Sequence, residues 1–96
     1  MDEIKKRIVK VAEKETRWEP YAKGYKVETG DGTLYVVPSL VPCQVEVALR
    51  DSAGKSLISF GYPSYLLKMV EANYTKAREN FQTEAASAAL DALERV

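Results

Sequence analysis

Apolar residues recur at helical spacing in the first fifteen residues, and polar residues fill the positions between them. Residues 2–15 therefore predict an amphipathic helix, with the acidic Asp2 and Glu3 in its first turn. This helix must end before Pro20, because the residue preceding a proline avoids the helical conformation. The predicted apolar stripe consists of Ile4, Ile8, Val11 and Ala12.

In the middle of the chain, apolar and polar residues alternate with the period of a β-strand. Residues 25–29 and 33–37 flank the turn Gly30-Asp31-Gly32 and predict a hairpin. Residues 44–50 alternate cleanly, and a turn joins them to residues 55–62 as a second hairpin. The pattern therefore predicts a four-stranded antiparallel sheet, but it does not determine the order of the strands.

The last third of the chain, Ser64–Val96, contains neither proline nor glycine and predicts helix throughout. An unbroken helix of this length would be about 50 Å long, whereas a domain of this size has a radius of gyration of about 13 Å. Either a break or a partner is therefore expected. The first apolar stripe consists of Leu66, Val70, Tyr74, Ala77 and Phe81, and the second consists of Ala85, Ala86, Ala89, Leu90, Leu93 and Val96.

The second stripe is shifted around the helix axis relative to the first. This shift predicts two helices with a bend near residues 80–83, where Asn80 or Thr83 could cap the second helix. Residues 1–96 are accordingly predicted to form a single α+β domain, with both helical segments packed on one face of the sheet. The residues expected inside are Val27, Val45, Val47, Leu49, Ile58 and Phe60.

The charge composition argues against some classes of function. The 14 basic residues balance the 14 acidic ones, so the net charge is zero. This balance argues against a non-specific nucleic-acid binder and makes self-association easier. The charged first fourteen residues do not resemble a signal peptide, and no apolar run reaches the length of a membrane span. With Cys43 as the single cysteine, we expect a reducing, cytoplasmic location and a buried thiol.

The sequence offers no recognisable catalytic constellation. It contains no histidine, which removes histidine acid–base catalysis and the usual activation of a nucleophile such as Cys43. The segment Gly30-Asp31-Gly32 is neither a phosphate-binding loop nor a calcium loop. We therefore predict a non-enzymatic protein, with no catalytic residue, cofactor or metal ligand.

Aromatic residues near two prolines are the first candidate interaction site. Trp18 and Tyr21 flank Pro20, while Tyr62 and Tyr65 flank the Pro63-Ser64 pair. Tyrosine and tryptophan are enriched at binding hot spots, and connecting segments lie at the surface. The four side chains could form an exposed interaction patch, or they could close the ends of a small core.

Two helical features offer further contact surfaces. Lys5, Lys6 and Lys10 cluster on the first predicted helix, either as a solvated face or as a weak basic patch. The alanine-rich stretch 85–89 allows another element to approach closely, within the chain or in a homodimer.

Three function classes follow. The favoured one is a cytoplasmic protein-interaction module that binds another protein or itself. A small regulator or inhibitor, of the kind encoded by viruses or mobile elements, fits that description. The alternatives are nucleic-acid binding through the basic face of the first helix, and a small-ligand or enzymatic domain that uses Tyr, Asp or Glu. No membrane partner is expected.

Overall fold

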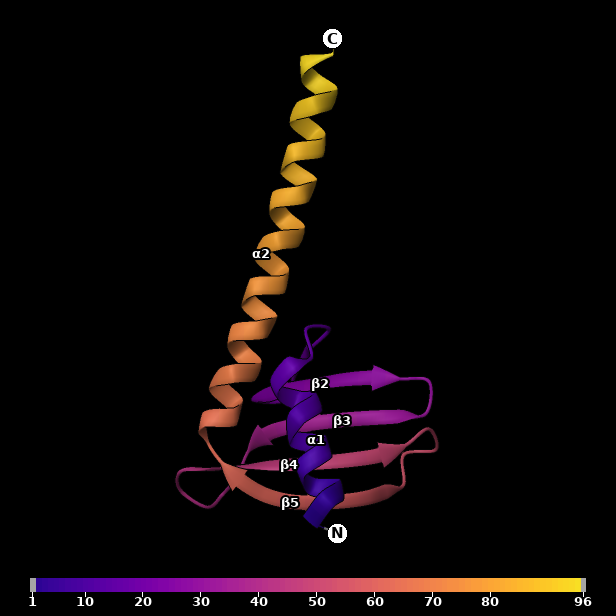
Figure 1. Ribbon diagram of the computed structural model, residues 1–96, viewed down its shortest axis with the longest axis vertical. Coiled ribbons are helices and arrows are strands. Elements are labelled where there is room, and N and C mark those ends of the chain that lie inside the picture. Colours follow the sequence, from indigo (N-terminus) through magenta and orange to yellow (C-terminus); the bar gives the residue numbers. More distant parts are fainter. Residues whose placement is uncertain (1, 96) are drawn as a thin grey trace.

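The chain folds as a five-stranded sheet with one helix lying across it and a second helix extending far beyond it (Figure 1). The computed structural model describes residues 2–95. The helices are α1 (Asp2–Lys14) and α2 (Tyr65–Glu94). The strands are β1 (Glu19–Tyr21), β2 (Gly24–Thr29), β3 (Gly32–Pro38), β4 (Gln44–Asp51) and β5 (Ser56–Pro63).

The α+β class and the antiparallel sheet confirm the prediction, but the number of strands was wrong. The strands follow chain order, β1-β2-β3-β4-β5, and each pairs with its neighbour in the sequence. The additional strand is β1, which was expected to be a connector because it contains Pro20. Pro20 lies opposite Tyr25 on an edge strand, where the missing N–H of proline need not cost a hydrogen bond.

One face of the sheet carries the core. Its strand residues face α1 and the first half of α2, which pack on that face, as predicted. Val27, Val45 and Val47 are buried as expected, whereas Leu49, Ile58 and Phe60 are only half-buried. The core comprises Ile8, Val9, Ala12, Trp18, Val27, Leu34, Val36, Val45, Val47, Leu66 and Val70.

The residues that α1 buries differ from the predicted apolar stripe. The helix buries Ile8, Val9 and Ala12, while Ile4 and Val11 remain 46% and 52% exposed. The buried face is centred on Ile8 and Ala12, so Val9 and Val11 lie on its two opposite margins. Only the Val9 margin is covered, and the Val11 margin borders an open groove beside the sheet.

The predicted bend in the last third is absent. Residues 65–94 form one continuous helix, and neither Asn80 nor Thr83 begins a second one. Its length makes the molecule elongated, with a radius of gyration of 16.6 Å and extents of 58 × 30 × 24 Å. Since no proline or glycine interrupts the segment and alanine favours helix, the backbone has no local reason to break.

The loop between β3 and β4 also differs from expectation. Cys43 is exposed there and has a φ of +63°, although it was expected to be buried. The surrounding residues 40–44 are all exposed, so the thiol lies at the surface with them.

Gly24 is needed for the close pairing of the first strands. A Cβ at this position would collide with the carbonyl oxygen of Val36 on β3. We expect Gly24→Ala to lower the free energy of unfolding by about 1–3 kcal/mol, because the strands must move apart. Chemical denaturation measures this loss. Gly30→Ala is the matched control, since a Cβ there meets no atom within 4 Å, and an equal loss in both variants would contradict the explanation.

Candidate functional site

Three of the large apolar side chains that are most exposed among residues 2–95 lie on the second half of α2, and Leu40, in the loop between β3 and β4, is more exposed still. Residues 65–77 pack against the body through Leu66 and Val70, whereas every side chain of residues 78–95, which we call the projecting segment, is exposed. In Figure 1 this segment continues well beyond the sheet and ends at the C-terminus. Phe81, Leu90 and Leu93 are 72%, 57% and 70% exposed, which is unusual for side chains of this size.

The projecting segment carries apolar residues on two sides. The inner face continues the line of Leu66 and Val70 and therefore points to the same side as the body. The outer face, at helical positions i, i+3, i+4 and i+7, is turned about half a revolution away from it. The inner face consists of Phe81, Ala85, Ala88 and Ala92, and the outer face consists of Ala86, Ala89, Leu90 and Leu93.

The charged residues within the projecting segment are acidic, and one arginine stands at each of its ends, Arg78 and Arg95. Four carboxylates and no basic side chain occur from residue 79 to residue 94. Glu79 and Glu94 lie on the same flank of the outer face, as helical spacing requires. The segment therefore presents an apolar strip with a negatively charged margin.

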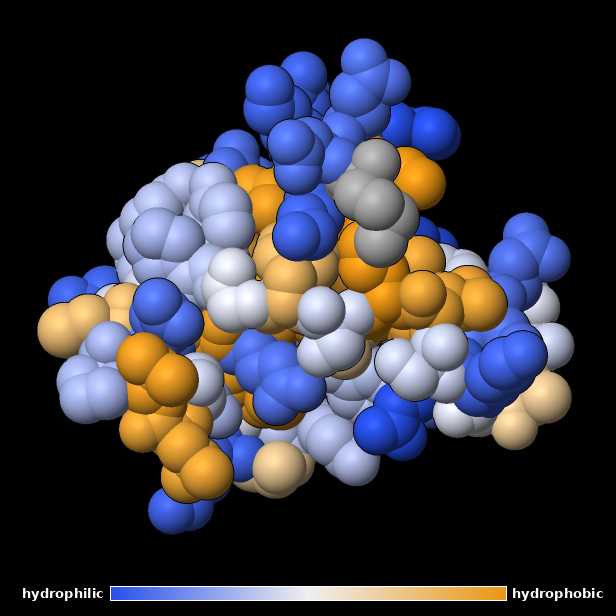
Figure 2. Space-filling model, turned by 90° about the horizontal axis from the view of Figure 1, so that it is seen from below, coloured by the Kyte–Doolittle hydropathy of each residue, from blue (hydrophilic) through white to orange (hydrophobic). Residues whose placement is uncertain are grey.

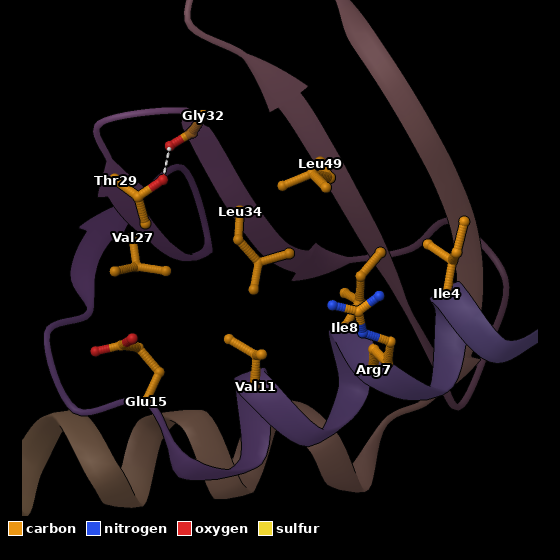
Figure 3. Close-up of a pocket in the computed structure, with 10 residues that line it drawn as sticks. All are labelled: Ile4, Arg7, Ile8, Val11, Glu15, Val27, Thr29, Gly32, Leu34 and Leu49. Atoms are coloured by element: carbon orange, nitrogen blue, oxygen red, sulfur yellow. Dashed lines mark hydrogen bonds between the residues drawn. The ribbon is translucent and has the colours of Figure 1, made fainter.

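A groove lies beside α1 on the covered face of the sheet, with a volume of about 370 Å³ (Figure 3). Its walls are apolar, and its polar lining comes from Arg7, Glu15 and Thr29. Figure 2, viewed from below, shows apolar surface between the end of α1 and the sheet, on the side where the groove opens. The apolar lining consists of Ile4, Ile8 and Val11 from α1 and of Val27, Leu34 and Leu49 from the sheet.

The carboxylate at the end of the groove is held in an ion pair. Glu15 accepts a hydrogen bond from the side chain of Arg17 at 2.9 Å. This hydrogen bond lowers the pKa of Glu15 to about 2, against an opposing effect of burial. Glu15 is therefore ionised and a weak base at neutral pH, so the groove is better suited to binding an apolar surface than to proton transfer.

The predicted aromatic residues fall in three different environments. Trp18 is 4% exposed and belongs to the core, where its Nε1 has no hydrogen-bond partner among the described residues. Tyr21 lies exposed on β1, with its ring 5.0 Å from that of Tyr35. The structure therefore does not place Trp18 and Tyr21 in one exposed patch.

The other two predicted tyrosines are together. The hydroxyl groups of Tyr62 and Tyr65 are 2.8 Å apart, and their ring centroids are separated by 5.7 Å. The hydrogen bond with Tyr62 raises the pKa of Tyr65 to about 12, so Tyr65 loses its proton at a higher pH than an ordinary tyrosine. This pair links the end of β5 to the first turn of α2. Its role in an interaction stays a prediction.

The predicted basic residues also lie together, around a second cavity of about 500 Å³ on the other side of α1. Lys5, Lys6 and Lys10 line it with Phe60 and Tyr62, and the acidic Asp2 and Glu13 line it as well. The ammonium group of Lys5 is 5.5 Å from the centre of the Phe60 ring, within the range of a cation–π interaction.

The opposite, exposed face of the sheet carries cation–aromatic pairs that no predicted site included. Lys26 lies 5.4 Å from the Tyr21 ring, and Arg50 lies 5.2 Å from the Tyr35 ring. Lys26 is also paired with Glu28 at 3.0 Å, so the cationic charge there is partly neutralised. The alternation of Lys26, Glu28 and Tyr35 with core positions was the available signal for this surface.

Two other kinds of feature are absent from residues 2–95. In that range, no group of three or more acidic, histidine or cysteine side chains is arranged to hold a metal ion. The described helices include none that is both long and apolar enough to cross a membrane. No family model, curated protein or solved structure matches the chain.

Proposed function

We propose that this protein is a protein-interaction module whose binding element is the projecting segment of α2. The observation that carries the proposal is the outer face of that segment, where Leu90 and Leu93 are exposed on the side away from the body. A straight helix cannot turn this face toward its own sheet. A partner can cover it, and burial of one leucine side chain contributes about 1.5–3 kcal/mol.

The length of the projecting segment supports the same function. Its 18 residues would be only marginally helical as an isolated peptide in water, because most helical stability in proteins comes from packing of an apolar face. The outer face of the segment has no such packing within residues 2–95. A partner that covers the outer face would stabilise the helix and gain a binding surface about 27 Å long.

Site-specific photo-crosslinking tests this function. We expect a benzophenone side chain at position 90 to form crosslinked protein products in a lysate or with purified protein, because this position points to the partner. The same group at position 87, on the polar side of the helix, is the control and should give much less product. Absence of products from position 90, or equal yields from both positions, would contradict the proposed function.

The second candidate function is nucleic-acid binding at the basic side of α1. It is favoured by the convergence of Lys5, Lys6 and Lys10 on a cavity lined by two aromatic rings. The neutral net charge weighs against it. An electrophoretic shift at low salt that disappears when these lysines are changed to glutamate would support it, and a shift that persists would exclude this face.

A further inference from the structure

The groove beside α1 has the form of an empty helix position on the sheet. In Figure 1, the first half of α2 lies toward one end of the strands, and α1 crosses the middle of the sheet. The groove lies toward the other end, where Thr29 and Gly32 line it beside the turn between β2 and β3. Apolar side chains from both α1 and the sheet project into it (Figure 3). Sheets of this kind bury such a face by packing a helix on it.

We propose that this groove binds the projecting segment of α2 from a second copy of the chain, so that two copies exchange their helices reciprocally. This inference rests on the proposed function and names the partner and its docking site. The chain's own projecting segment cannot occupy the groove, because α2 is continuous and leads away from it. A second copy brings the same segment from outside.

Charge complementarity favours this occupant. Arg7 lines the groove, and Lys10 and Lys14 line an adjoining cavity. The ionised Glu15 lines both cavities, but its charge is balanced by the ion pair with Arg17. The incoming segment carries Glu79 and Glu94 on one flank of its outer face, and its four acidic residues outnumber the two arginines at its ends. Opposite charges at the rim of an apolar contact set orientation and favour association.

Pairing two projecting segments with each other is less favourable. Each would bring four carboxylates to the contact, against two arginines that stand only at the ends of the segment. Docking on α1 places these carboxylates near basic side chains instead.

Size and shape are also compatible. The projecting segment is about 27 Å long, and α1, which forms one wall of the groove, is about 20 Å long. Alanines at positions 86 and 89 on the outer face allow the helix axis to approach the sheet closely, while Leu90 and Leu93 would enter the space between Val11 and Leu49. Because the exchange is reciprocal, a two-fold dimer contains two equivalent docking contacts, and neither copy keeps an unoccupied groove or an unbound projecting segment.

Disulfide trapping between two variants tests the docking site. In a background in which Cys43 is changed to Asn, which tolerates the left-handed conformation, one variant carries Val11→Cys and the other carries Leu90→Cys. We expect mild oxidation of their mixture to link position 11 of one copy to position 90 of the other. Ser59→Cys, exposed on the opposite face of the sheet, replaces Val11→Cys in the control and should give several-fold less product.

A charge exchange provides the second measurement. Arg7→Glu with Lys14→Glu should weaken dimerisation by about tenfold or more in light scattering, and adding Glu79→Lys with Glu94→Lys to the same chain should restore it. These four residues lie outside the core, so folding is expected to persist.

Three results would overturn the inference: a monomer at all concentrations, equal trapping at positions 11 and 59, or links only between two copies of position 90. If photo-crosslinking at position 90 then captures a different protein, the proposed function stands and only the choice of partner is wrong. If position 90 captures nothing, both fail.

Discussion

Leu66→Ala is expected to lower the free energy of unfolding by about 2–5 kcal/mol, the range for truncating a fully buried leucine. Leu66 is 0% exposed and lies in the first turn of α2, where this helix joins the core. Removing its side chain leaves a cavity at the position that fixes α2 to the sheet. The loss is measured by urea denaturation monitored through Trp18, which is itself part of the core.

Leu93→Ala is the matched control for this substitution. It makes the same chemical change in the same helix, but at a side chain that is 70% exposed. At low protein concentration, where any dimer is dissociated, its effect should stay within about 0.5 kcal/mol. A comparable loss in both variants would show that the projecting segment packs on its own body in solution.

A proline at position 86 is expected to disrupt the projecting segment without destabilising the rest of the protein. Proline in a helix interior costs about 3 kcal/mol relative to alanine, because a hydrogen bond is lost and the ring collides with the preceding turn. In Ala86→Pro this cost falls on the projecting segment. We therefore expect reduced helical circular dichroism and loss of partner binding, with an almost unchanged unfolding midpoint for the sheet.

Ala72→Pro places the same break in the packed half of α2. Ala72 is itself exposed, so the substitution disturbs the backbone without removing a core side chain. The break falls between Val70, which is buried, and Asn73, whose side-chain amide donates a hydrogen bond to the carbonyl oxygen of Glu13 at 2.8 Å. Global stability should fall by about 3 kcal/mol. If Ala86→Pro destabilised the sheet equally, the independence of the projecting segment would be disproved.

The sheet was predictable because side chains alternate with a period of two along a strand. Val45 and Val47 could be assigned to the core from that pattern alone, and both are buried. The three-residue strand β1 was missed because Pro20 is a signal against strands, and its tolerance at an edge depends on which strand lies beside it.

The projecting segment and the groove beside α1 were less predictable, because they depend on how the two helices are oriented relative to the sheet. The change of apolar face after Thr83 was visible in the sequence, but it was interpreted as a bend, and a partner for an unbroken helix was left as the alternative. The exposure of Val11 results from the rotation of α1 on the sheet, which helical periodicity does not determine. The amount of free space beside that helix is a tertiary property, and the groove could not be found from spacing alone.

The chain-order sheet has a consequence for the rate of folding. Each strand pairs with the one next to it in sequence, so the sheet can form by closing short loops, which is entropically cheap and fast. The contact between Asn73 and Glu13 spans 60 residues and brings the two helices together. We therefore expect the sheet to form first and the meeting of the terminal helices to be the slower, later event in folding.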